Sequence, residues 1–247
     1  MKIYSIFIYS ISYIFLLTGA CDTNIVTPTT NTTGTGGSLA RFVIQDTYLY
    51  TVDRKTLRIF DLSSGSAKFT SSKTIGFTIE TIFALGNTLF LGSTDGVYIY
   101  DITDRITPSF LSKYDHIVSC DPVVADAKYA YSTLRTGDTR CVRGTNVLDI
   151  IDITNLTSPK RVFSLVMSNP KGLGLIGTDK LVVCDNGLKL LNITDRLKPI
   201  LLHNYTSISA TDIIPFSNSF TAVTEGGMSN FTIRNDSITL IGKLEYK

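Results

Sequence analysis

The sequence predicts an all-β protein, a five-bladed β-propeller built from four-stranded repeats of about 40 residues. The main observation is a motif such as Val-Tyr-Ile-Tyr-Asp-Ile-Thr, which occurs at residues 57–63, 97–103, 148–154 and 188–194 and, in a degenerate form, at 228–233. Its anchor positions are Phe60, Tyr100, Ile151, Leu191 and Phe231, spaced by 40, 51, 40 and 40 residues. A fixed period near 40 in a strand-rich chain is typical of a propeller.

Each repeat reads as four short strands in a constant order. The first strand is apolar, as at 42–44 or 82–85, and a tight polar turn leads to a second strand, as at 48–50 or 89–91. The third strand carries the motif, and a fourth follows, as at 110–114. Short β-branched and aromatic runs bounded by Gly, Asn, Asp and Ser indicate strands and turns, and helical spacing of apolar residues is absent after residue 20.

The third strand is apolar on both of its faces. In the second repeat, Val97 and Ile99 alternate with Tyr98 and Tyr100. A strand of this kind must be covered on both sides, as it is inside a blade between two neighbouring blades. We expect the last strand, at 239–244, to complete the first blade and lock the ring, which would remove exposed sheet edges.

The first 20 residues indicate export. They hold one charge, Lys2, an apolar run at 3–17 and the small residues 18–20, the pattern of a signal peptide. The run of about 15 residues is too short for a permanent membrane helix. Cys21 follows directly, as in a bacterial lipoprotein signal, whose cysteine becomes the lipidated (palmitate-bearing) first residue of a stably anchored protein. The alternative is an ordinary signal peptide that leaves Cys21 as a spare thiol.

Residues 21–38 predict a flexible tether between this anchor and a propeller domain at 39–247. The tether consists mostly of Thr, Asn, Gly and Pro, which cannot bury enough apolar surface to offset the entropy of ordering. Without residues 1–20 the chain keeps 22 basic and 21 acidic residues, since only Lys2 is removed. This balance gives no electrostatic case for nucleic-acid binding. The expected partners are the membrane, through the anchor, and an envelope protein or glycan.

The motif copies resemble the LVIVD repeat of bacterial surface and secreted propeller proteins. The stretches 119–124 and 169–174 resemble the lipoprotein members of that family. The resemblance covers about residues 37–247 and departs from the pattern at Asn192 and Thr232, which stand where the motif has Asp. It implies a propeller on the bacterial cell envelope, at the outer membrane or cell surface, and it implies no settled activity.

The 51-residue spacing marks an insertion at 134–146, between the second and third strands of the third repeat. Cys120, just before the first strand of the same repeat, and Cys141, in the insertion, are expected on one face of the blade. Disulfides persist in exported proteins. We predict a Cys120–Cys141 bridge, worth about 3 kcal/mol, against the alternative of two free thiols. Cys184 ends an apolar strand and is expected to be a small buried hydrophobe.

The inserted loop is the best candidate for recognition, because loops held by rigid scaffolds are where binding residues concentrate. Its candidate binding residues are Arg135, Asp138, Arg140 and Arg143. The arginines could hold carboxylate, sulfate or phosphate groups through forked hydrogen bonds. The alternative is a solvated surface loop with no ligand.

The starts of the inner strands should surround the mouth of the central channel. The residues there are Arg41, Thr81, Asp121, Gly172 and Asp212. Arg41, Asp121 and Asp212 are candidate binding residues, and the two carboxylates suggest a carbohydrate-active enzyme as an alternative function. We find no third acid at an equivalent position, so a binding or scaffold role is the preferred prediction.

No cofactor or metal is expected. The turn acids Asp53, Asp95, Asp185 and Glu225 could attract Ca²⁺, but they lack a dense run of oxygen ligands and read better as turn residues. With only two histidines in the chain, neither a zinc site nor a Ser-His-Asp triad is expected. No phosphate-binding loop or dinucleotide fingerprint occurs.

Overall fold

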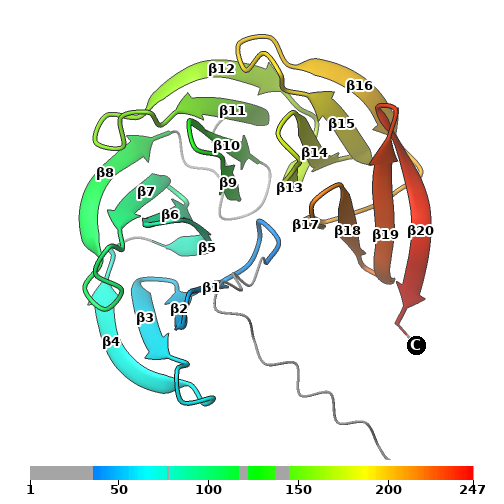
Figure 1. The fold of residues 1–247 in the computed structure, drawn as a ribbon. Helices are drawn as coiled ribbons and strands as arrows, with labels where there is room; N and C mark the ends of the chain where they lie inside the picture. The colour runs from blue at the N-terminus through cyan, green and yellow to red at the C-terminus, as the bar shows by residue number, and fades with distance from the viewer. Residues whose placement is uncertain (1–35, 77, 117–121, 137–144, 247) are drawn as a thin grey trace, which may run out of the picture.

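The computed structural model describes residues 36–76, 78–116, 122–136 and 145–246, which form five four-stranded antiparallel sheets (Figure 1). In each sheet the strands are neighbours in chain order, so one sequence repeat makes one blade. The all-β class and the count of five blades predicted from the sequence are therefore confirmed. No helix in the described part of the chain is long and apolar enough to cross a membrane.

The twenty strands divide evenly among the blades. Blade 1 contains β1 (Phe42–Gln45), β2 (Tyr48–Asp53), β3 (Thr56–Asp61) and β4 (Lys68–Thr74). Blade 2 contains β5 (Ile79–Leu85), β6 (Thr88–Ser93), β7 (Gly96–Asp101) and β8 (Ser109–Asp115). Blade 3 contains β9 (Val123–Ala125), β10 (Tyr129–Leu134), β11 (Val147–Asp152) and β12 (Lys160–Val166). Blade 4 contains β13 (Pro170–Ile176), β14 (Lys180–Asp185), β15 (Leu188–Asn192) and β16 (Ile200–Tyr205). Blade 5 contains β17 (Asp212–Pro215), β18 (Ser219–Thr224), β19 (Gly227–Arg234) and β20 (Ser237–Glu245).

The motif has the same local geometry in every blade. The pairing of the third and fourth strands shifts by one residue immediately before each anchor residue, for example between Ile99 and Tyr100 in blade 2. Such a bulge bends the strand and increases its twist. In the first four blades the Asp or Asn after the anchor then closes the following turn, as Asp101 Oδ1 accepts the Thr103 N–H at 2.7 Å and Asn192 Oδ1 accepts the Thr194 N–H at 2.8 Å. Asn192 therefore accepts the same hydrogen bond in the turn that Asp accepts in the other copies of the motif.

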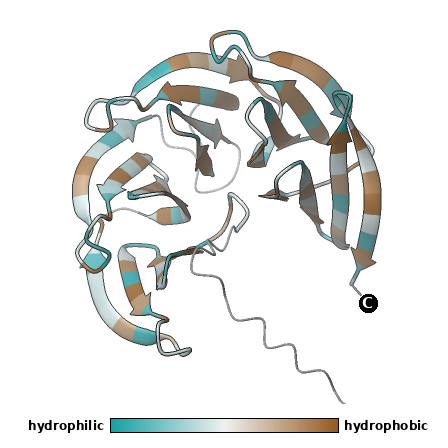
Figure 2. Cartoon of the chain, in the orientation of Figure 1, coloured by the Kyte–Doolittle hydropathy of each residue, from teal (hydrophilic) through white to brown (hydrophobic). Residues whose placement is uncertain are grey.

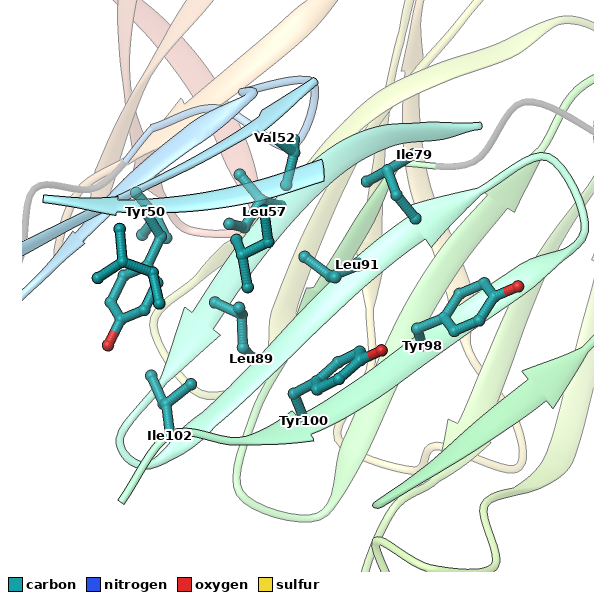
Figure 3. Close-up of a cluster of buried hydrophobic side chains, with 12 residues drawn as sticks. Tyr50, Val52, Leu57, Ile79, Leu89, Leu91, Tyr98, Tyr100 and Ile102 are labelled. Atoms are coloured by element: carbon teal, nitrogen blue, oxygen red, sulfur yellow. The ribbon is translucent and has the colours of Figure 1, made fainter. Parts of the chain in front are cut away.

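Four apolar cores join successive blades. In the first, Tyr50, Val52 and Leu57 of blade 1 point toward Leu89 and Leu91 of blade 2 (Figure 3). Equivalent cores join blades 2 and 3, blades 3 and 4, and blades 4 and 5. The hydropathy colouring places brown bands on the inner three strands of most blades, where the sheets face each other (Figure 2). The third strands of blades 2, 3 and 4 are thus covered on both faces, as their sequence predicts.

Arginines that follow the third strand form ion pairs and hydrogen bonds between neighbouring blades. Arg105 of blade 2 reaches Asp46 of blade 1 with its Nη2 2.7 Å from Asp46 Oδ2. Arg196 of blade 4 reaches blade 3, where it binds Asp126 Oδ2 at 3.1 Å and the Tyr131 hydroxyl at 3.0 Å. Each of these polar contacts connects two blades that an apolar core already joins.

The ring is not closed in the predicted way. The strand expected to complete blade 1 is β20, and it pairs with β19 inside blade 5. The blades lie along an arc with blades 1 and 5 at its two ends (Figure 1), and no core cluster of the described residues joins those two blades. The predicted closure is therefore wrong, because each blade takes its outer strand from its own repeat.

The two end blades differ in the face that they leave uncovered. In blade 5, Thr221 and Asn230 occupy positions that hold Tyr50 and Ile59 in blade 1, and the Thr221 hydroxyl donates to Asn230 Oδ1 at 2.6 Å. Blade 5 thus ends the arc with a partly polar face, as terminal repeats do in other repeat proteins. The uncovered face of blade 1 carries large apolar side chains, with Phe42 and Phe69 each more than half exposed.

Candidate functional site

One edge of the blades, which we call the loop face, carries those predicted site residues that the structure describes. It comprises the turns between second and third strands and the residues that lead into each first strand. The register brings these segments together, because the start of each first strand lies beside the end of its second strand, as Asp212 lies opposite Val223.

The two ends of the inserted loop of blade 3 are tied together on this face. It connects β10, which ends at Leu134, to β11, which begins at Val147, as predicted. The Thr136 N–H and hydroxyl donate to Asn146 Oδ1 at 2.8 and 3.1 Å, and Asn146 Nδ2 donates to the Ser168 carbonyl next to blade 4. Blade 3 and the segment that leads into blade 4 therefore hold the two ends of the loop in place.

Only part of the predicted binding loop is described. Arg135 lies at its base and is partly buried. The remaining candidates, Asp138, Arg140 and Arg143, lie outside the described residues. So do Asp121, the lipidation candidate Cys21 and the cysteines of the predicted bridge, Cys120 and Cys141. The fourth cysteine, Cys184, is 1 % exposed, and burial raises the pKa of its thiol, so the prediction of a small buried hydrophobe is confirmed.

Beside the loop base, Asp185 forms a clamp on the residues that lead into blade 4. Its carboxylate accepts the backbone N–H groups of Ser168 and Asn169 and lies 2.7 Å from Lys189 Nζ. Burial alone would raise the pKa of Asp185, but these donors and the Lys189 charge outweigh burial and lower it. Asp185 therefore remains a carboxylate and acts as a structural anchor of the loop face.

Asp212 binds the chain segment in front of blade 1. Its carboxylate accepts the Ser38 hydroxyl at 2.8 Å, the Leu39 N–H at 3.1 Å and the Ile213 N–H at 2.9 Å. Burial raises the pKa of Asp212, and these three donors oppose that shift only in part. With the residue 9 % exposed, its carboxylate serves an internal contact of the fold.

The same contact moves the boundary of the predicted tether. Ser38 was expected to end the flexible segment 21–38, yet it is 2 % exposed and accepts the Leu173 N–H of blade 4 at 2.8 Å. The Ala40 carbonyl accepts the Ile82 N–H of blade 2 at 3.0 Å. The segment just before β1 is thus held by blades 2, 4 and 5 and belongs to the folded domain, because its polar groups have partners there.

The other predicted mouth residues do not form an acidic centre with Asp212. Arg41 is exposed, and none of its side-chain atoms makes a hydrogen bond or ion pair within the described residues. Gly172 packs directly against Asp212, since a Cβ added there would lie 2.2 Å from Asp212 Oδ1. Thr81 is buried in β5.

Most of the turn acids pair with neighbouring side chains. Asp53 lies 3.2 Å from Arg58 Nη1, and Asp95 lies 2.7 Å from Lys113 Nζ. Asp185 holds Lys189, as described above. Within residues 36–246, apart from the undescribed gaps, no three His, Cys, Asp or Glu side chains gather as a metal ion would require.

A cavity of about 550 Å³ opens on the loop face of blade 5, beside the segment 207–209 that connects blade 4 to it. Glu225 is at its rim, and Ser229, Phe231 and Lys243 line it. The sequence reasoning missed this cavity. A signal was present in the repeat alignment, because Ser229 stands where the second and fourth repeats have the larger Tyr98 and Lys189.

Comparison with known proteins supports the repeat and the fold. A family model for the LVIVD repeat matches residues 137–166. No curated protein sequence matches the chain significantly. Solved structures match over most of its length, at sequence identities that speak for the fold alone.

Three of these structures illustrate the likeness. A functionally unknown protein from Desulfotomaculum acetoxidans superposes with a TM-score of 0.67 at 9% identity, covering 87% of this chain and 69% of that one. A Lactobacillus plantarum protein gives 0.64 at 13% identity, with 80% and 67% covered. The periplasmic gluconolactonase PpgL of Pseudomonas aeruginosa gives 0.61 at 10% identity, with 81% and 68% covered. The chain is thus a five-bladed β-propeller that carries an LVIVD repeat.

Proposed function

We propose that this propeller is a binding or scaffold module of the bacterial cell envelope, anchored by lipid on Cys21, which presents its loop face to a protein or glycan partner. The observation that carries the proposal is the tied base of the inserted loop. Hydrogen bonds from Thr136 to Asn146 and from Asn146 to Ser168 hold the loop against two blades. A loop whose two ends are held in place loses less conformational entropy on binding than one with free ends, which favours affinity.

The test is an envelope pull-down with the tagged protein. The variant replaces residues 135–146 with an Asp-Gly turn, which suits a two-residue hairpin, and adds Cys120→Ser so that no orphan thiol remains. We expect wild type to retain a partner that this variant loses. The Cys120→Ser variant with the loop intact is the control, and a partner retained equally by all three proteins would contradict a role for the loop.

An enzyme acting on carbohydrate through Asp121 and Asp212 is the competing hypothesis. The gluconolactonase likeness supports it only at the level of fold, because the identity is 10%. The contacts of Asp212 count against it, since its carboxylate is buried and occupied by three internal donors. If glycan cleavage were found and the Asp121→Asn/Asp212→Asn variant abolished it in a folded protein, the enzyme hypothesis would replace the binding module.

A further inference from the structure

The cavity on the loop face of blade 5 is an unassigned site, and we infer that it binds a neutral saccharide unit. Its volume of about 550 Å³ falls within the range of about 300–1,000 Å³ common for small-molecule sites. It opens on the loop face, beside the turn that holds Glu225 and the residues Ser207 and Ile208 that lead toward β17.

Blades 2 and 4 show how a large side chain can fill this position. In blade 2, Tyr98 occupies the place of Ser229, and its ring lies 5.2 Å from Lys113 Nζ, which in turn binds Asp95. In blade 4, Lys189 occupies the same place and binds Asp185. Both blades therefore fill the space above the third strand with a large side chain and its ionic partner.

Blade 5 has counterparts of Lys113 and Asp185 beside this position, but it has no large side chain at the position itself. Lys243 lies opposite Ser229 in the sheet, as Lys113 lies opposite Tyr98. The Ser229 side chain is too short to fill the space that Tyr98 fills in blade 2, so the space stays open. Glu225, placed where blade 4 has Asp185, makes no hydrogen bond or ion pair with any described residue and is exposed at the rim. The Glu225 carboxylate, at the rim of an open cavity, can therefore accept hydrogen bonds from a ligand.

The lining suits a sugar ring. Phe231 forms an apolar wall and is held in place by stacking on Phe220, with ring centroids 5.3 Å apart. Aromatic and aliphatic surface of this kind packs against the C–H face of a pyranose, while the polar groups can meet its hydroxyls. Ionised Glu225 only accepts hydrogen bonds and Lys243 only donates them. Lys243 is already paired with Glu245, whose Oε1 lies 2.6 Å from Lys243 Nζ. The Glu225 carboxylate therefore leaves the site with a negative charge, which favours a neutral saccharide over an anionic one.

The inference deepens the proposed binding role by naming a ligand class, and it uses no residue of the inserted loop. The loop replacement leaves the cavity intact, and the cavity variants leave the loop intact. Failure of one experiment therefore does not decide the other.

The test is saturable chemical-shift perturbation of the backbone amides of the mature chain by a panel of neutral mono- and disaccharides. We expect shifts at residues 207–209 and 224–227. Ser229→Tyr, which installs the residue of blade 2, should weaken binding by about tenfold or more by filling the cavity, and Glu225→Gln should weaken it by about tenfold through loss of a charged acceptor. Ser72→Tyr, the same change on an exposed strand of blade 1, is the matched control and should bind like wild type.

Two results would overturn the inference. One is a panel in which no neutral saccharide shifts these amides. The other is a Ser229→Tyr protein with an unchanged unfolding curve and wild-type affinity. Because Glu225 is exposed, Glu225→Gln leaves the packing of blade 5 intact and keeps the test valid if Ser229→Tyr fails to fold.

Discussion

Asp212 shows how one side chain connects distant parts of the chain. Its position at the start of an inner strand was predicted from the repeat spacing, and the structure confirms that position. Its partner Ser38 could not be predicted, because the two residues are 174 positions apart and nothing in the local pattern links them. The sequence therefore suggested an open carboxylate at the channel mouth, and the structure gives a buried one.

The close approach of Gly172 to Asp212 leads to a stability prediction. Gly172→Ala would place a methyl group 2.2 Å from Asp212 Oδ1. We expect it to lower the free energy of unfolding by about 1–3 kcal/mol through overpacking, measured by urea denaturation. Gly226→Ala is the control, because an added Cβ there meets no atom within 4 Å and its φ lies outside the left-handed region. Equal stability of the two variants would show that Asp212 moves aside at little cost.

At the scale of the elements, strands and turns were predictable and the pairing of the last strand was not. The alternation of apolar residues and the Asp, Asn and Gly turns define each strand locally. Residues 239–244 read as an outer strand in either blade 1 or blade 5, since an outer strand has few buried side chains to set its register. The short connection from β19 to β20 through Asn235 and Asp236, both at positive φ, decides in favour of a hairpin within blade 5.

The Asp185 clamp predicts a pH dependence. Its folded pKa is lowered, so its contribution to stability is present above the ordinary pKa of about 4 and is lost as the pH falls through the folded value. Asp185→Asn should reduce the free energy of unfolding by about 2 kcal/mol at pH 7, and the difference from wild type should shrink as the pH falls below about 4. Urea denaturation at pH 7, 5, 4 and 3 measures this, and a difference that stays constant with pH would contradict it.

For the whole molecule, the sequence predicted the number and content of the blades but not the open arc. Closure depends on how the blade 1 and blade 5 faces meet, and the repeat pattern describes only neighbours within the chain. In retrospect, the polar Thr221 and Asn230 on the outer face of blade 5 were the available signal. They replace core residues of the motif where no further blade packs.

The open arc predicts unequal local stability. Blade 3 has an apolar core on each side, whereas blades 1 and 5 have a core on one side only. In arrays of repeats, end units open more readily than central ones. We expect amides of β10 to exchange with deuterium more slowly than those of β2 and β18, all three being second strands flanked by neighbours within their sheets. Similar protection of the three strands would indicate that blades 1 and 5 meet in solution.

The segment in front of β1 also determines how the domain bears mechanical load. A pull on the chain ahead of Gly36 reaches Ser38 and Leu39 first, and these residues are hydrogen-bonded to blades 4 and 5. The force is therefore divided among several bonds at the centre before it can peel β1 from β2. A domain held at its hub in this way resists mechanical unfolding that starts from its first strand.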